Sequence, residues 1–202
     1  MNILFVCTGN TCRSPMAAAL LKNKRPAYHV KSAGIFANEN LEPNRHAVRA
    51  LYQYDIQLSH QSTQITEKLL NWADLVLTMT TNHVQTLIME YPQFQEKYYT
   101  LKEFALGADN KVWKELQGAY GRIQEKQTNI IQKYQLQLDQ HELKERMLQE
   151  CEEDVLKIRQ LESEMVDYNI SDPFGGSLEV YEQTLAELNR YIDQTIEKIE
   201  TD

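Results

Sequence analysis

The stretch Cys7-Thr8-Gly9-Asn10-Thr11-Cys12-Arg13-Ser14 lies between a short apolar run at residues 2–6 and strong helix formers at residues 16–22. The apolar run is typical of a strand that is buried on both faces of a parallel sheet. The polar stretch is rich in loop-forming residues, and Ser14 can cap the following helix, with Pro15 in its first turn. A strand, a polar loop and a helix start in this order point backbone N–H groups at an anion, so we expect an anion site here.

Further strand and helix patterns alternate along the chain. An alternation of this kind predicts an α/β fold, in which a parallel sheet is covered by helices on both faces. Such sheets place their ligand sites at the carboxyl ends of the strands, which is where Cys7 lies. The other expected strands are residues 28–32, 75–79 and 97–101. The other expected helices are residues 46–54, 66–73, 82–89 and 178–199, the last with an apolar stripe.

A different kind of sequence separates these parts from the last helix. Residues 122–171 contain neither Gly nor Pro, and their apolar residues recur at three- and four-residue steps, as in coiled coils. Both ends must return to one small domain, so we expect two antiparallel helices with a turn near residues 135–140. A long helix exchanged or paired with a second subunit is the alternative. The predicted domains are residues 1–108 with 170–202, interrupted by a helical insertion at 109–169. The apolar residues that recur in this way form a stripe, which includes Met147, Cys151, Val155, Ile158, Leu161 and Met165.

Composition and charge narrow the class of protein. The 202 residues include 21 Lys and Arg against 29 Asp and Glu, a net charge of −8, so the basic surface that nucleic-acid binding requires is missing. No stretch approaches the length of a membrane span, and the N-terminus lacks the features of a secretory signal. Three cysteines are too few for a disulfide scaffold. We therefore expect a cytoplasmic protein that binds neither nucleic acid nor a membrane.

Cys7 and Arg13 are candidates for a nucleophile and a phosphate clamp. Their spacing alone is a weak signal, because it arises often by chance, but its place between a strand and a helix start strengthens it. A helix N-terminus and inward backbone N–H groups stabilise a thiolate, and the planar fork of Arg13 can hold two phosphate oxygens. Gly9 allows close backbone approach and Asn10 suits a left-handed turn. Ser14 can donate a hydrogen bond to the sulfur when it becomes the leaving group.

A second element, Asp172-Pro173-Phe174-Gly175-Gly176-Ser177, supplies a candidate general acid. Attack by Cys7 expels the side chain that carried the phosphate, and the leaving atom needs a proton. Asp172, on a loop over the pocket, can give that proton and then activate the water that hydrolyses the thiophosphate. Pro173 makes the loop rigid, and Phe174 can wall the substrate slot. Because Asp-Pro alone is more often a turn, this role depends on the pairing with Cys7.

These motifs resemble those of the low-molecular-weight protein tyrosine phosphatase family, and within it the bacterial protein arginine phosphatases. Further matches are Ser32-Ala33-Gly34, His46-Ala47-Val48, Ala73-Asp74-Leu75-Val76-Leu77 and Leu101-Lys102-Glu103. The resemblance implies a four-stranded parallel sheet with helices on both faces, no metal or cofactor, and phosphorylated proteins as substrates. It implies catalysis by Cys7, Arg13 and Asp172 through a cysteinyl-phosphate. It also implies phosphate or substrate contacts from Thr8, Gly9, Asn10, Thr11, Cys12, Ser14 and Phe174.

Thr11 is the residue that bears on the choice of substrate. In the family, a bulkier aliphatic residue at this position accompanies phosphotyrosine specificity, whereas threonine accompanies phosphoarginine. A phosphoguanidinium is slender and planar and carries N–H donors, so a small wall with an acceptor hydroxyl fits it better. Phe174-Gly175 replaces the paired tyrosines of several tyrosine-specific members, which points the same way. We therefore expect hydrolysis of phosphoarginine in proteins, with phosphotyrosine as the alternative substrate.

Two other functions are less favoured. An arsenate reductase on the same fold needs relay cysteines near the pocket, and this chain offers only Cys12 and the distant Cys151. A non-enzymatic phosphate-binding scaffold has no need of the nucleophile that Cys7 provides. Cys12 is either a small buried residue or, as the resemblance suggests, the partner of Cys7 in a reversible protective disulfide.

The helical insertion departs from the family pattern and lies immediately before Asp172. It is either a tolerated surface insertion, an arm for a dimer or partner contact, or a lid that selects substrates. Its position raises the question of whether the acid loop still reaches the pocket. His46 and His83 are expected to be structural or surface residues, and Cys151 is expected to pack on the apolar stripe.

Overall fold

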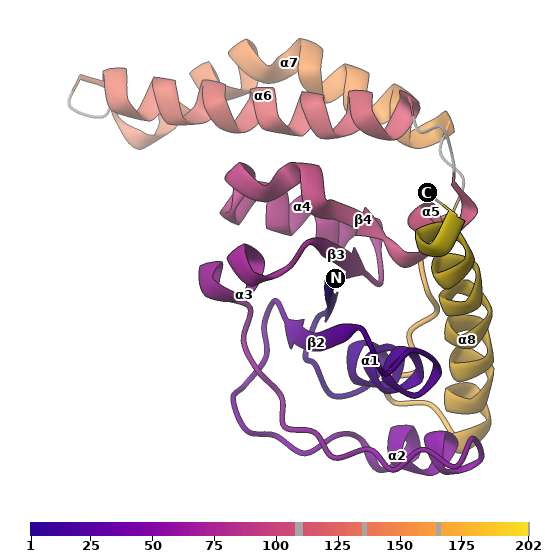
Figure 1. Ribbon diagram of the computed structural model, residues 1–202. Coiled ribbons are helices and arrows are strands. Elements are labelled where there is room, and N and C mark those ends of the chain that lie inside the picture. The colour runs from indigo at the N-terminus through magenta and orange to yellow at the C-terminus, as the bar shows by residue number, and fades with distance from the viewer. Residues whose placement is uncertain (108–110, 135–136, 165–166, 202) are drawn as a thin grey trace. The chain divides into compact units, whose positions relative to one another are not determined.

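The computed structural model describes the chain except for residues 108–110, 135–136, 165–166 and 202, which are grey in Figure 1. The chain divides into two compact units. The first unit comprises residues 1–87, 96–108 and 168–202, and the second comprises residues 88–95 and 109–167. Compared with the predicted boundaries, residues 88–95 join the helical unit and residues 168–169 join the first unit.

The first unit is built on a parallel sheet of four strands in the order β2-β1-β3-β4. The strands are β1 (Asn2–Cys7), β2 (His29–Gly34), β3 (Leu75–Thr78) and β4 (Tyr98–Thr100). Residues 3–6 of β1 are fully buried, as expected for a central strand that is covered on both faces. The predicted four-stranded parallel sheet is confirmed.

Helices cover both faces of this sheet, and the strand order explains how. The connection from β1 to β2 runs toward one edge, whereas the connections from β2 to β3 and from β3 to β4 run toward the other. Since such crossovers are right-handed, α1 lies on one face, and α3 and α4 lie on the opposite face (Figure 1). The helices of these connections are α1 (Arg13–Lys24), α2 (Arg45–Tyr52), α3 (Glu67–Trp72) and α4 (Thr81–Glu90), and a 3-10 helix, η1, spans Pro92–Lys97.

The C-terminal helix α8 (Leu178–Thr201) packs on α1, α2 and α5. Tyr181, Leu185, Leu188 and Ile192 on its inner side are fully buried, which confirms the predicted apolar stripe. The last member of the predicted stripe, Ile199, is only partly buried, near the end of the helix.

The short helix α5 (Leu101–Leu106) was not predicted, and it ends β4 one residue earlier than expected. Thr100 and Glu103 form a reciprocal capping box, in which each side chain accepts a hydrogen bond from the other residue's backbone N–H. The Thr-x-x-Glu spacing is a sequence signal for a helix start, and it favours a helix over continuation of the strand. Gly107 closes the helix in the left-handed conformation.

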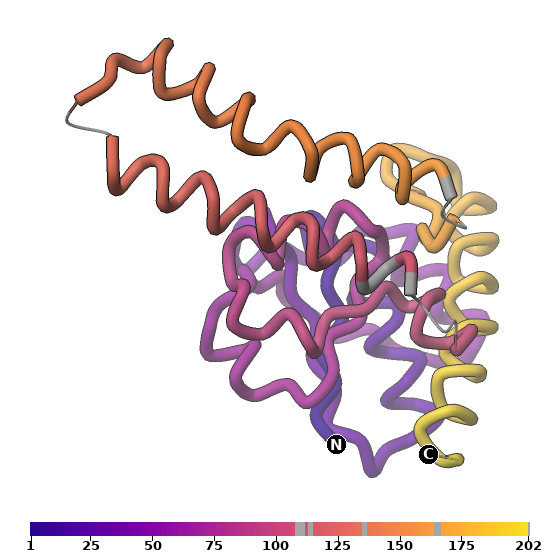
Figure 2. Tube along the Cα trace, turned by 90° about the horizontal axis from the view of Figure 1, so that it is seen from above, coloured from indigo at the N-terminus to yellow at the C-terminus, as the bar shows by residue number. Residues whose placement is uncertain are grey.

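The second unit contains two long helices, α6 (Lys111–Tyr134) and α7 (Gln140–Glu164). Figure 2 shows them side by side, and their contacts confirm the predicted antiparallel hairpin. Of the predicted turn at 135–140, residues 137–139 lie between the two helices and Gln140 begins α7, whereas residues 135–136 are outside the described part of the chain. Of the predicted stripe, Cys151, Ile158 and Leu161 are buried, whereas Met165 is outside the described residues.

An ion-pair cluster joins α6 to α7 within the hairpin. The buried Asp154 on α7 accepts hydrogen bonds from Arg122 Nε at 2.8 Å and Lys126 Nζ at 2.7 Å on α6. The Lys126 hydrogen bond is the largest cause of a lowered pKa of the Asp154 carboxyl. No helix in the described ranges is long and apolar enough to cross a bilayer.

We predict that Asp154→Asn loosens the α6–α7 hairpin without affecting the first unit. Folding lowers the pKa of the Asp154 carboxyl below its ordinary value of 3.8, so the ion pair contributes its full stability at a pH above that value. The contribution is lost as the pH falls through the lower pKa of the folded state. At neutral pH, amides of residues 116–130 and 147–161 should exchange with solvent about two- to fivefold faster in the variant. The exposed Glu152→Gln is the matched control. Equal exchange in Asp154→Asn and wild type would show that the cluster does not stabilise the hairpin.

Candidate functional site

Cys7 ends the central strand β1, and the loop that follows folds around its sulfur. The Asn10 backbone N–H donates to Cys7 Sγ at 3.3 Å, and Ser14 Oγ lies 3.0 Å from the same sulfur. Only 3% of Cys7 is exposed. A thiolate here is stabilised by donors that are already in place and by the N-terminus of α1, which begins at Arg13.

Asn10 holds the loop in this shape. Its backbone is in the left-handed region (φ 54°), and its side chain is fully buried. The side-chain amide donates to Ser14 Oγ at 2.8 Å and to Ser32 Oγ at 3.0 Å, while Oδ1 accepts from the Thr63 N–H at 2.9 Å. His60 Nε2 lies 2.8 Å from the Asn10 carbonyl oxygen and donates to it, because a carbonyl only accepts.

The prediction that Ser14 caps α1 is wrong. The N-cap residue is Cys12, which makes no side-chain capping bond, and Ser14 is the second residue of α1 and completely buried. Ser14 Oγ accepts from the Asn10 amide, so its own proton remains available for Cys7 Sγ at 3.0 Å or the Ala33 carbonyl at 3.4 Å. Tertiary contacts with the sulfur therefore override the local capping preference of serine.

Gly34 pairs with Cys7 on the neighbouring strand β2, at a place where the loop leaves no room for a side chain. A Cβ placed there would lie 2.6 Å from the Thr8 carbonyl oxygen and 2.9 Å from the Asn10 backbone nitrogen. Gly9 is different, since a Cβ there would come no closer than 3.9 Å to Thr11 Oγ1. The absence of a side chain at Gly34 lets the loop close against β2.

Arg13 and Asp172 meet at the mouth of this loop. Arg13 Nη2 donates to Asp172 Oδ2 at 2.7 Å, and Nη1 lies 3.5 Å from the Ile170 carbonyl oxygen. The Arg13 side chain is 6% exposed and that of Asp172 is 53% exposed, so a buried cation faces a carboxylate that reaches solvent. Asp172 Oδ1 also accepts the Phe174 N–H at 3.2 Å, which fixes the loop geometry.

The loop that carries Asp172 is anchored where it leaves the helical insertion. The Ile170 N–H donates to the Met79 carbonyl at 2.8 Å, and the Thr81 N–H donates to Asn169 Oδ1 at 2.9 Å. Ser171 Oγ donates to Glu187 on α8 at 2.7 Å. These contacts tie the loop to the carboxyl end of β3 and to α8. The insertion therefore does not displace Asp172 from Arg13.

The pocket around Cys7 has a volume of about 270 Å³. Phe174 stands at its rim and is 77% exposed, a position open to contact with a substrate. Thr11 is partly exposed in its wall, with Oγ1 3.6 Å from Cys12 Sγ. The lining residues are Cys7, Thr8, Gly9, Thr11, Cys12, Arg13, Asp172 and Phe174. The predicted residues Asn10 and Ser14 lie behind this lining, where they shape the loop.

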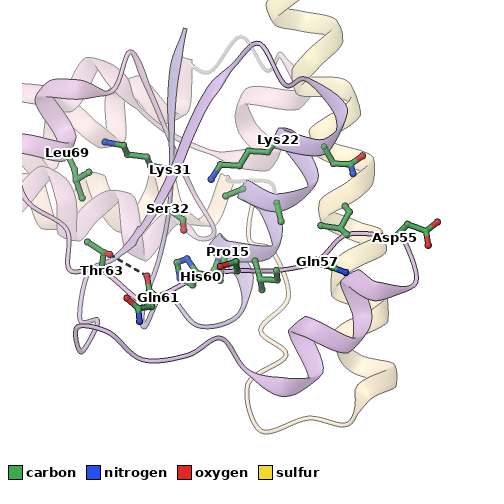
Figure 3. A pocket seen from close by; sticks show the side chains of 16 residues that line it. Pro15, Lys22, Lys31, Ser32, Asp55, Gln57, His60, Gln61, Thr63 and Leu69 are labelled. Carbon is green, nitrogen blue, oxygen red and sulfur yellow. Dashed lines mark hydrogen bonds between the residues drawn. The ribbon is translucent and has the colours of Figure 1, made fainter.

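A larger hollow of about 680 Å³ lies beside α1 and β2 (Figure 3). Its wall includes Ser32, His60 and Thr63, which are partners of Asn10, but it includes none of the three predicted catalytic residues. Volume is a poorer guide here than chemistry. The Cys7 thiol, the Arg13 guanidinium and the Asp172 carboxylate converge in the smaller pocket.

Tyr181 and His46 connect the back of the loop to α8 and to the acid loop. Tyr181 is fully buried, and its hydroxyl lies 3.2 Å from Cys12 Sγ. Burial raises the pKa of the Cys12 thiol, and burial followed by this hydrogen bond raises the pKa of Tyr181. His46 packs edge-on against Tyr181, with ring centroids 5.4 Å apart, and its Nδ1 lies 3.3 Å from the Gly176 carbonyl.

Several residues of the site were missed at the sequence level. Ser32, His60, Thr63 and Tyr181 come from four separate segments, and their tertiary position identifies them as partners of the loop, although Ser32 lies in a segment that resembles the family. Within the part of the chain that the structure describes, no group of three or more His, Cys, Asp or Glu side chains is arranged to hold a metal ion. All three cysteines are free thiols, and Cys151 is buried, as predicted.

We predict that Gly34→Ala damages the pocket by pushing the Thr8 and Asn10 backbone outward. Overpacking of this kind costs about 1–3 kcal/mol of the free energy of unfolding. It should also weaken inhibition by inorganic phosphate by roughly tenfold or more, because the loop N–H groups no longer point toward one phosphate position. Gly118→Ala on α6, where only the flexible Arg122 side chain is near, is the control. Unchanged phosphate inhibition in Gly34→Ala would contradict this account of the loop.

The chain is similar to known phosphatases in sequence and in fold. A family model described as low molecular weight phosphotyrosine protein phosphatase matches residues 2–140. A protein-arginine-phosphatase of Geobacillus stearothermophilus is 34% identical over 201 residues, which cover 99% of this chain and 97% of that protein. The low molecular weight protein-tyrosine-phosphatase PtpB of Staphylococcus aureus is 38% identical over 104 residues, 52% of this chain and 73% of that protein.

A solved structure extends the comparison to the fold. It is described as a YwlE arginine phosphatase mutant with a phosphorylated active site serine. It has a TM-score of 0.69 and 32% sequence identity, and the match covers 100% of this chain and 97% of that chain.

Proposed function

Because this chain belongs to the low molecular weight phosphotyrosine protein phosphatase family, we propose that it is a protein-arginine phosphatase that works through a phosphocysteine at Cys7. The observation that carries the proposal is the convergence of Cys7, Arg13 and Asp172 on one pocket of about 270 Å³. These three groups supply the nucleophile, the charge clamp and the proton donor that transfer of a phosphoryl group to sulfur requires.

The first step transfers the phosphoryl group from substrate to enzyme. The Cys7 thiolate attacks phosphorus, the S–P bond forms and the bond to the guanidine nitrogen breaks. Arg13 and the inward N–H groups of the loop hold the equatorial oxygens, on which negative charge is spread. Protonated Asp172 gives its proton to the departing nitrogen as the P–N bond breaks, so that the arginine side chain leaves as a guanidinium.

The second step restores the enzyme. Asp172, now a carboxylate, takes a proton from a water molecule that attacks phosphorus, and the S–P bond breaks. Inorganic phosphate leaves, and the sulfur departs as a thiolate. Ser14 Oγ, 3.0 Å from the sulfur, and the Asn10 N–H at 3.3 Å stabilise that thiolate.

Three observations favour arginine as the phosphorylated residue. Thr11 puts a small side chain with an acceptor oxygen in the pocket wall. The exposed Asp172 carboxyl group is placed to accept from a guanidinium N–H with one oxygen and to give the proton on its other oxygen to the leaving nitrogen. Among curated relatives, the arginine phosphatase of Geobacillus stearothermophilus matches almost the whole chain and the tyrosine phosphatase PtpB about half of it, although solved structures named as tyrosine phosphatases also match the whole chain.

Phosphotyrosine hydrolysis is the second candidate function. It uses the same nucleophile, clamp and acid, and the family description names it. Proteins bearing phosphorylated side chains are the proposed substrates in either case. A reducing compartment such as the cytoplasm suits a thiolate nucleophile. The dimer or partner contact predicted for the helical insertion stays a prediction.

The test is a side-by-side measurement of kcat/KM on a phosphoarginine peptide and a phosphotyrosine peptide of the same sequence. We expect wild type to prefer phosphoarginine, and Thr11→Ile to reduce that preference by roughly tenfold or more. In this variant an ethyl group replaces the hydroxyl, so the pocket narrows and the hydroxyl acceptor is lost. Cys7→Ser should be inactive on both peptides. Equal or better turnover of phosphotyrosine by wild type would overturn the arginine assignment and leave a tyrosine phosphatase.

A further inference from the structure

His83 is a buried, titratable side chain beside the active-site loop that the mechanism above does not use. It lies in the first turn of α4, just beyond the carboxyl end of β3, and only 8% of it is exposed. Its Nε2 lies 2.9 Å from Thr8 Oγ1, and its Nδ1 lies 2.9 Å from Thr80 Oγ1. Both ring nitrogens therefore have hydroxyl partners, one of which belongs to the residue next to the nucleophile.

The ring is held in one position from behind. The His83 backbone N–H donates to Thr80 Oγ1 at 3.3 Å, so Thr80 also begins α4 as a capping residue. The Thr80 carbonyl in turn accepts from Thr78 Oγ1 at 2.9 Å. Because Nδ1 and the backbone N–H of His83 both contact Thr80 Oγ1, the ring is held with Nε2 facing Thr8.

His83 is a neutral imidazole at physiological pH. Burial lowers its pKa to about 4, and the positive charge of Arg13 acts in the same direction, against a smaller opposing effect of Asp172. A neutral ring has one donor and one acceptor nitrogen, so the contact with Thr8 is a hydrogen bond between neutral groups in either tautomer. It holds the Thr8 hydroxyl oxygen in place without adding a second positive charge beside Arg13.

Thr8 lines the catalytic pocket together with Thr11. Its carbonyl accepts the Phe36 N–H at 2.9 Å, so its backbone is held as well as its side chain. A hydroxyl has one proton and two lone pairs, and the single bond to His83 leaves at least one lone pair for a ligand. A phosphoguanidinium brings N–H donors next to the phosphate, whereas a phenyl phosphate brings only carbon at the same place.

We propose that Thr8, oriented by His83, is a specificity-determining acceptor for a guanidinium N–H of the substrate. Thr8 touches the substrate, and His83 is a positioning residue that acts through it. This inference rests on the proposed function and deepens it, because it adds a second polar contact that a phosphotyrosine substrate does not use. A guanidinium donor that leaves water on binding and finds no acceptor is costly, which is how one acceptor produces discrimination.

The test compares Thr8→Val and His83→Phe with wild type on the paired phosphoarginine and phosphotyrosine peptides. Each variant removes the hydrogen bond while approximately keeping the shape of the side chain. We expect kcat/KM for phosphoarginine to fall by roughly five- to tenfold in each, and kcat/KM for phosphotyrosine to change by less than about twofold. The double variant should lose no more than the stronger single variant, because both changes break one interaction.

Two further variants separate positioning from simple packing. His83→Gln can place a polar atom near the position of Nε2, and it should recover most of the phosphoarginine activity that His83→Phe loses. Thr86→Val removes another hydroxyl from α4, one that bonds only to the Asn82 carbonyl, and it should leave both activities unchanged. If His83→Phe fails to fold, Thr8→Val decides the question, because it leaves the buried ring intact.

The outcomes distinguish this inference from the proposed function. If wild type prefers phosphoarginine but Thr8→Val keeps that preference, the inference is wrong and the proposed function stands. Equal losses on both substrates also overturn it, since they indicate a structural role for Thr8 and His83. If wild type shows no preference for phosphoarginine, the proposed function fails, and this inference fails with it.

Discussion

The site depends on the left-handed turn at Asn10, which brings hydrogen-bond donors to one sulfur atom. Its N–H donates to Cys7 Sγ, and its side-chain amide binds Ser14, whose hydroxyl also contacts the sulfur. Because the side chain of Asn10 is fully buried and bonds to two further segments, the loop has its shape before any ligand arrives. A cradle that is organised in advance stabilises a thiolate and a bound phosphate without reorganisation.

The sheet fixes where the loop and Asp172 lie relative to each other. Cys7 lies at the carboxyl end of β1 opposite Gly34, and the missing side chain at Gly34 lets the loop close over the neighbouring strand. The acid loop returns to the same edge through backbone and side-chain bonds to Met79 and Thr81 at the end of β3. Asp172 therefore reaches Arg13 by short-range anchoring, although 159 positions separate the two residues in sequence.

The sequence predicts those helices and strands that depend on residues close together in the chain. The buried strand β1 follows from its continuous apolar run, and the α6–α7 hairpin and the apolar stripe of α8 follow from hydrophobic periodicity. The Thr100-x-x-Glu103 box marks a helix that was overlooked. Capping by Ser14 was wrong because the sulfur and Asn10 compete for the same hydroxyl. Partners such as His60 and His83 could not be predicted, since nothing in their own segments distinguishes them from ordinary surface histidines.

The central claim is that a phosphoryl group passes through Cys7, and trapping that intermediate tests it most directly. Asp172→Asn lacks the base that activates water, so phosphocysteine should accumulate on it more than on wild type. After rapid acid quench of this variant with an activated phosphoryl substrate that needs no proton for its leaving group, peptide mass spectrometry should find one phosphoryl group on Cys7. A phosphoryl group on any other residue, or none at all while phosphate is still released, would contradict the account.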